Sequence, residues 1–154
     1  VYFTLPERKV YLFEKYRETY VKRLLSFRSA CDNAAKGSDM MLCIENTGIN
    51  LPFVLEGVDL LLQSPVFSLT WDIGHDYSAN KADSPFLLPR KDRIRHMHFH
   101  DAKGTDCHLP PGFGHLPLAS IMCSVSPERM VLEVKTIQGI HQSLPWLKEH
   151  NLIS

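Results

Sequence analysis

Four short apolar runs, separated by segments with helical patterns, most constrain the fold of this 154-residue chain. Apolar runs without polar alternation are typical of strands buried on both faces, as in parallel sheets. Strands that alternate with helices at this spacing predict right-handed βαβ units, and therefore an α/β fold with a parallel sheet. The runs cover residues 40–44, 66–71, 94–100 and 130–132, and residues 1–4 are a candidate for the stub of a further strand.

The segments between these runs carry the helical patterns. Apolar residues step by three and four from Phe13 to Ala34, which predicts one long helix that Gly37 ends. Shorter helices are expected over residues 52–62, 116–123 and 137–150, an interrupted helix within 79–93, and a loop over 103–114.

Composition weighs against several classes of protein. The 17 basic residues balance the 17 acidic ones, so the chain has no broad basic field for nucleic acid or for a membrane surface. No apolar run approaches the roughly 20 residues of a membrane span. The four cysteines lie far apart without a CxxC pair, which favours reduced thiols. We therefore expect a cytoplasmic protein with neither a membrane nor a nucleic acid as its partner.

Each apolar run ends in a side chain that can bind a metal ion. The four residues are Glu45, Asp72, His98 and Glu133. Ligands of parallel α/β folds bind at the carboxyl ends of the strands, so we expect these side chains to meet. Two glutamates, an aspartate and a histidine form an oxygen-rich set that suits Mn²⁺, Mg²⁺, Co²⁺ or Zn²⁺. One glutamate after a strand is more often a solvated loop residue, and the repetition in all four runs is what indicates a site.

Histidines add to this pattern. His96, His98 and His100 alternate along the third run and therefore share one face of a strand, whereas the residues between them face the covering helices. Buried imidazoles need polar partners, which favours a pocket at this face. His75 follows Asp72 by three residues and is expected to reach the same pocket.

Five motifs in this order resemble a known superfamily. They are Ile44-Glu45-Asn46, Asp72-Ile73-Gly74-His75, His96-Met97-His98-Phe99-His100-Asp101, His108-Leu109-Pro110-Pro111-Gly112-Phe113-Gly114 and Val131-Leu132-Glu133-Val134-Lys135. Together they resemble the xylose-isomerase-like TIM-barrel superfamily (AP endonuclease family 2) of sugar and sugar-phosphate isomerases and epimerases. The resemblance covers about residues 41–135.

This resemblance implies the C-terminal half of a (β/α)₈ barrel, because a complete barrel needs roughly 250 residues. We expect residues 1–154 to be a single domain that forms this C-terminal portion. An open half-barrel would expose both sheet edges and much of its apolar interior. The chain is therefore expected to need the missing half of the barrel, a partner chain or a second copy.

The resemblance also implies roles for individual residues. One divalent metal would be bound by Glu45, Asp72, His98 and Glu133, and the two glutamates would transfer a proton through a cis-enediolate. The substrate would be a small sugar, sugar phosphate or polyol. The candidates for substrate binding are His75, His100, His108 and Lys135, although a solvated lysine is an equally good interpretation of Lys135.

Three alternatives stay open. Apurinic-site endonucleases of the superfamily add a metal site for which His75, Asp106 and His108 are the matching residues here. Dehydratases of cyclic polyols share the same ligand pattern, so loss of water would use the same residues. A barrel that binds a sugar or a metal without turnover is the third. The pair His100-Asp101 departs from epimerases of free ketohexoses, so the resemblance does not identify the substrate.

Overall fold

The computed structural model describes residues 2–46, 48–49 and 51–154. Contacts between residues divide the chain into two compact units, which are described separately. The first contains residues 1–41 and 51–67, and the second contains residues 42–50 and 68–154. The single domain expected over residues 1–154 stays a prediction. Within the described ranges, no helix combines the length and the apolar character that a membrane span requires.

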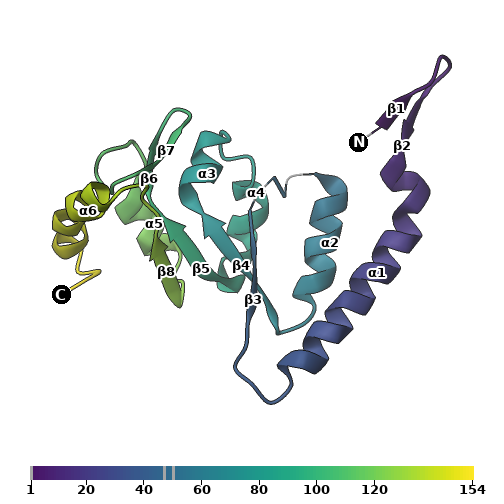
Figure 1. The fold of residues 1–154 in the computed structure, drawn as a ribbon, viewed down its shortest axis with the longest axis horizontal. Helices are drawn as coiled ribbons and strands as arrows, with labels where there is room; N and C mark the ends of the chain where they lie inside the picture. The colour runs from purple at the N-terminus through teal and green to yellow at the C-terminus, as the bar shows by residue number, and fades with distance from the viewer. Residues whose placement is uncertain (1, 47, 50) are drawn as a thin grey trace. The chain divides into compact units, whose positions relative to one another are not determined.

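The first unit begins with a hairpin (Figure 1). Strand β1 (Tyr2–Thr4) pairs antiparallel with β2 (Lys9–Tyr11), and the backbones of Leu5 and Arg8 bond to each other across the turn. Pro6 suits this turn because its ring presets φ. Residues 2–4 thus form the strand that was expected, but it belongs to a hairpin and not to the parallel sheet; Val1 lies outside the described residues.

Two helices complete the first unit. Helix α1 (Leu12–Ala35) confirms the long helix, and Gly37 follows it at φ 78°. Helix α2 (Pro52–Leu62) confirms the helix predicted over residues 52–62 and contacts α1. Gly57 of α2 faces Tyr20 of α1, and a Cβ atom at Gly57 would lie 2.0 Å from Oη of Tyr20. That hydroxyl donates to the carbonyl of Phe53 at 3.2 Å. The position of the Tyr20 side chain against α2 therefore depends on the absence of a side chain at Gly57.

A four-stranded sheet forms the centre of the second unit (Figure 1). Its pairs β4–β5 and β5–β8 are parallel, and Asp72 stands opposite His98 in the register. This arrangement confirms the predicted α/β fold and fits the C-terminal half of a TIM barrel. The strand order is β3 (Leu42–Glu45), β4 (Phe67–Asp72, of which the contacts assign Phe67 to the first unit), β5 (Ile94–Phe99) and β8 (Arg129–Leu132).

Burial follows the position of each strand in the sheet. All six residues of β4 are buried, and Phe99 of β5 packs on Trp146 of helix α6 (Ile137–Glu149), as expected for side chains that face covering helices. Burial on both faces was the wrong prediction for residues 40–44, where Met40, Met41 and Cys43 are exposed. The physical reason is that β3 is an outer strand of the sheet.

Helices connect these strands. The interrupted helix expected within residues 79–93 is confirmed over residues 84–93, where an α-helical turn passes into a 3₁₀ helix. A separate helix that was not predicted, α3 (Ile73–Ser78), begins directly at the end of β4. Residues 103–114, predicted as a loop, contain most of an antiparallel hairpin that turns at Gly104, at φ 61°. The remaining elements are α4 (Ser84–Leu87), a 3₁₀ helix (Leu88–Arg93), β6 (Asp101–Lys103), β7 (Asp106–Leu109) and α5 (Leu118–Ser124).

Replacing Gly57 should destabilise the first unit. The methyl group of Gly57→Ala would overlap Oη of Tyr20, and we expect the free energy of unfolding to fall by about 1–3 kcal/mol in urea denaturation. Tyr20→Phe removes the overlapping atom, so the same substitution should cost less in that background. Equal losses in both backgrounds would contradict the overlap.

Candidate functional site

The four predicted metal-type residues come together at the carboxyl ends of the strands. Glu45 ends β3, Asp72 ends β4, His98 lies in β5 and Glu133 follows β8. Nδ1 of His98 is the common point: it lies 3.3 Å from Oε1 of Glu45, 3.5 Å from Oδ2 of Asp72 and 3.3 Å from Oε2 of Glu133. We call these four residues the acidic centre. Their role as metal ligands stays a prediction.

Three buried atoms of the acidic centre have no hydrogen-bond partner among the described residues. They are Oδ2 of Asp72, Nδ1 of His98 and Oε2 of Glu133. A buried polar group without a partner costs roughly 1–3 kcal/mol. Donor atoms that bind one zinc ion at about 2.0–2.2 Å lie roughly 3–3.5 Å from one another, and the distances around Nδ1 fall in this range. The residues therefore fit a divalent cation, which would satisfy all three atoms.

The carboxylate of Asp72 is held by one backbone N–H and one imidazole ring. Its Oδ1 accepts a hydrogen bond from the backbone N–H of His75 at 2.7 Å and lies 3.0 Å from Nε2 of His100. Burial by itself raises the pKa of Asp72, but the hydrogen bonds from His100 and His75, together with the charges of these imidazoles, hold that pKa below its ordinary value. The carboxylate therefore stays ionised, which is the form that binds a cation.

Asn46 is a positioning residue whose role sequence reasoning did not identify. Its buried side-chain amide donates to the carbonyl of Asp72 at 3.1 Å and accepts from the N–H of the same residue. The side chain thus continues the pairing of β3 with β4 beyond the last residue of β3. An amide directly after the glutamate of a strand end was the available signal, but its partner depends on the register of the sheet.

His96 shares the strand face with His98, as predicted, but its side chain takes another partner. Its Nδ1 lies 3.1 Å from Oγ1 of Thr70. Partial burial and the neighbouring His98 lower the pKa of His96, against the opposing charge of Glu45. A neutral ring that is paired with a hydroxyl lies beside the acidic centre without joining it.

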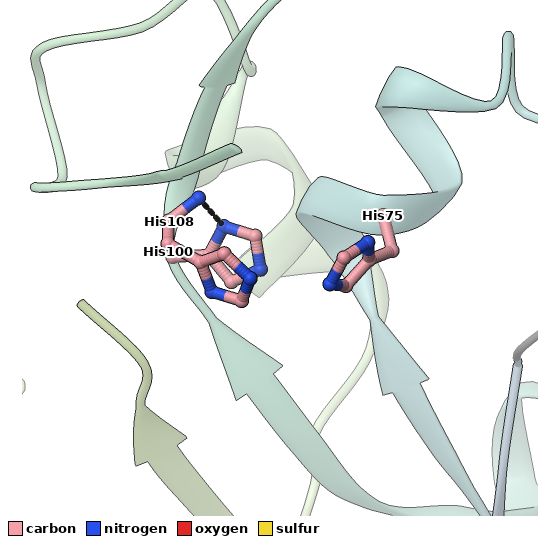
Figure 2. Close-up of side chains that lie close together, drawn as sticks. All are labelled: His75, His100 and His108. Carbon is pink, nitrogen blue, oxygen red and sulfur yellow. Dashed lines mark hydrogen bonds between the residues drawn. The ribbon is translucent and has the colours of Figure 1, made fainter. Parts of the chain in front are cut away.

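Three histidines form a second group next to the acidic centre. Figure 2 shows His75 on α3 facing His100 and His108. The rings of His100 and His108 stack with centroids 4.3 Å apart, and His75 approaches His108 edge-on at 4.9 Å. These are three of the four residues predicted to bind substrate. The fourth, Lys135, is exposed, and its role stays a prediction.

The structure brings together two of the three residues predicted for a second metal site. His75 and His108 lie together, but the third member of their group is His100 and not Asp106. Asp106 is exposed and belongs to none of the candidate metal groups within the described residues. In a regular strand, Asp106 and His108 would share one face because they are two residues apart. His108 adopts φ 62°, so the backbone is irregular here and the two side chains do not point the same way.

Asp101 organises the loop that follows β5. Its carboxylate is 1% exposed and accepts four backbone N–H groups, which neutralises the cost of burying a charge. Gly114 is required here, because a Cβ atom at this position would lie 2.3 Å from Oδ1 of Asp101. The donors are Ala102 and Leu116 to Oδ1, and Gly112 and Gly114 to Oδ2, at 2.8–3.0 Å.

Comparison with known proteins gave one match. The model of a family described as xylose isomerase-like TIM barrel matches residues 6–150. Searches of curated proteins and of solved structures found no match. The matched range contains the acidic centre and the three histidines.

Asp101→Asn should destabilise the second unit. The amide nitrogen of asparagine cannot accept, so two backbone N–H groups would lose their acceptor, and we expect the free energy of unfolding to fall by roughly 2–4 kcal/mol. Urea denaturation measures the loss, and hydrogen exchange should quicken at the amides that lose their acceptor. Asp106→Asn, at an exposed aspartate of the same hairpin, is the matched control. Equal stability of the two variants would contradict the role of Asp101.

Proposed function

The chain belongs to the xylose isomerase-like TIM barrel family, and we propose that it is a divalent-metal-dependent isomerase or epimerase of sugars or sugar phosphates. The observation that carries the proposal is the acidic centre, where Glu45, Asp72 and Glu133 surround Nδ1 of His98 and three buried atoms lack partners. Three carboxylates this close to one another are stable when a cation lies among them.

The acidic centre would hold the metal through Glu45, Asp72, His98 and Glu133. Its carboxylate oxygens and single imidazole suit Mn²⁺, Mg²⁺, Co²⁺ or Zn²⁺. When bound, such an ion supplies a Lewis acid that stabilises negative charge on substrate oxygens. Asp72 is fully buried and held by the backbone N–H of His75 and the ring of His100, so it is suited to holding the ion and unsuited to exchanging protons with a substrate.

The two glutamates are the candidates for proton transfer. Their side chains are 37% and 41% exposed, so a substrate can reach both. Glu45 comes from outer strand β3 and Glu133 follows outer strand β8, so they approach His98 from the two opposite edges of the sheet. One carboxylate would remove a proton from the carbon next to a carbonyl, and the other would return a proton, with an enediolate between the two steps.

His75 and His108 of the histidine group would bind the hydroxyls of the substrate. Nδ1 of His108 lies 3.1 Å from the carbonyl oxygen of Glu133, which can only accept, so this nitrogen carries the proton. In a neutral ring, Nε2 of His108 is then a free acceptor for a hydroxyl. The side chain of His75 is 47% exposed and lies beside it. Lys135, which is exposed, remains a candidate for a phosphate or hydroxyl contact.

A nuclease with a second metal site has weaker support. Asp106, which would complete that site with His75 and His108, lies outside their group. The balanced charge of the chain also offers no broad basic surface for DNA. A polyol dehydratase would use the same four residues of the acidic centre, so only the reaction product distinguishes it from an isomerase.

Glu133→Gln should abolish metal-dependent exchange of a sugar C–H proton with solvent. Losing a general acid or base costs about 10²–10⁴-fold in rate. The exchange is followed by NMR in D₂O on a panel of ketoses and ketose phosphates with added Mn²⁺ or Co²⁺, and a chelator should stop it. Glu45→Gln should act in the same way, and Glu149→Gln, at an exposed residue of α6, is the matched control.

Each other outcome of that experiment identifies a different function. Full exchange in Glu133→Gln would contradict the role of the glutamate. Incision of abasic DNA by the wild-type chain would support a nuclease, loss of water from a polyol would support a dehydratase, and metal binding without turnover would support a binding protein.

We further propose that this chain completes its sheet with other strands, from the missing half of the barrel, a partner chain or a second copy. Among the described residues, no strand pairs with the outer side of β3 or of β8. Val131 of β8 is exposed by 46%, and an unpaired edge with exposed apolar residues favours association.

The isolated chain should therefore associate with itself at micromolar concentration. Sedimentation velocity over a range of concentrations measures this, and the sedimentation coefficient should rise with concentration. A monomer at all concentrations that melts in one cooperative transition would contradict the proposal.

A further inference from the structure

Both ring nitrogens of His100 have polar neighbours, and the ring is fully buried. Nε2 lies 3.0 Å from Oδ1 of Asp72. Nδ1 lies 2.8 Å from the backbone nitrogen of His108, a hydrogen bond that Figure 2 draws as a dashed line. Nδ1 also lies 3.2 Å from the carbonyl oxygen of Asp101.

These contacts determine where the proton of the neutral ring resides. A backbone N–H can only donate, so Nδ1 accepts from His108 and carries no proton. The single proton is then on Nε2, which donates to the carboxylate of Asp72. The carbonyl of Asp101 would pair with Nδ1 only if that nitrogen carried a proton, and the shorter bond from His108 would then be lost.

We propose that His100 is a positioning residue that aims Asp72 at the acidic centre. By donating to Oδ1, it occupies one oxygen of the carboxylate and leaves Oδ2, 3.5 Å from Nδ1 of His98, for a cation. Because both nitrogens are engaged, His100 neither binds the metal nor contacts a substrate. This inference rests on the proposed metal-binding function of the acidic centre.

One feature of the chain makes room for the ring of His100, and another holds the His108 amide that donates to it. A Cβ atom at Gly74 would lie 1.9 Å from Cε1 of His100, so the ring fits only against a glycine. The hairpin that carries the His108 amide lies within the loop that Asp101 organises through four N–H groups. The position of the ring is thus fixed from both sides.

Two nearly isosteric variants separate the two hydrogen bonds of His100. Glutamine places its amide nitrogen near the position of Nε2, so His100→Gln keeps the donor to Asp72 and loses the acceptor for His108. Asparagine places its carbonyl oxygen near the position of Nδ1, so His100→Asn keeps that acceptor and loses the donor. We expect the affinity for Mn²⁺ or Zn²⁺, measured by calorimetry on the full chain, to fall about 10–100-fold in His100→Asn and by less than about threefold in His100→Gln.

A second measurement needs no metal. In protein labelled with ¹⁵N-histidine, long-range ¹H–¹⁵N correlation at a pH where the ring is neutral should show the proton of His100 on Nε2. A proton on Nδ1 would overturn the proposal. Thermal melting of both variants reports on the fold, since a purely structural role would lower the melting temperature and the metal affinity of both together.

The outcomes separate this inference from the proposed function. If the wild-type chain binds the metal and His100→Asn binds it equally well, or if both variants lose affinity alike, His100 does not position Asp72, although the acidic centre stands. If the wild-type chain binds neither Mn²⁺ nor Zn²⁺, the acidic centre is not a metal site, and both proposals fail.

Discussion

The burial of the Asp72 carboxylate is the constraint on which the site depends. A charge that is removed from water needs strong partners, and the chain supplies them from several directions. The backbone of α3 and the ring of His100 bond Oδ1, while Asn46 bonds the main chain of Asp72 from the end of β3. The parallel register then sets His98 opposite Asp72. Among the described residues, these interactions leave Oδ2 of Asp72 without a hydrogen bond, and that oxygen belongs to the acidic centre.

The second unit contains another buried carboxylate, and its hydrogen bonds differ from those of Asp72. Asp101 accepts four backbone N–H groups, two on each oxygen, so nothing at this side chain is left for a ligand. Among the described residues, Asp72 has hydrogen-bond partners on one carboxylate oxygen only. The two residues are equally inaccessible, so burial alone does not separate their roles. The two aspartates differ in how many of their carboxylate oxygens accept hydrogen bonds. A buried oxygen without a hydrogen bond is rare and indicates a place where a ligand can supply the missing interaction.

Much of the sheet and the acidic centre could be predicted from the sequence because both follow from strong local patterns. Long apolar runs mark the central strands, and the residues that end parallel strands meet at one edge. The strands β2, β6 and β7, and with them the two hairpin pairings, could not be predicted in this way, since these strands are short and contain no continuous apolar run. The sequence also did not show that His100, and not Asp106, lies with His75 and His108. This grouping depends on the positive φ of His108, which the spacing Asp-x-His does not reveal.

The two glutamates connect the proposed chemistry to the edges of the sheet. Glu45 ends β3 and Glu133 follows β8, so each carboxylate lies beside an edge without a described partner. Strands that complete the sheet would border both side chains and would reduce the exposure that they have here. With less water around them, the two carboxylates would interact more strongly with a bound cation and with a substrate. Completion of the sheet and proton transfer are therefore expected to depend on each other.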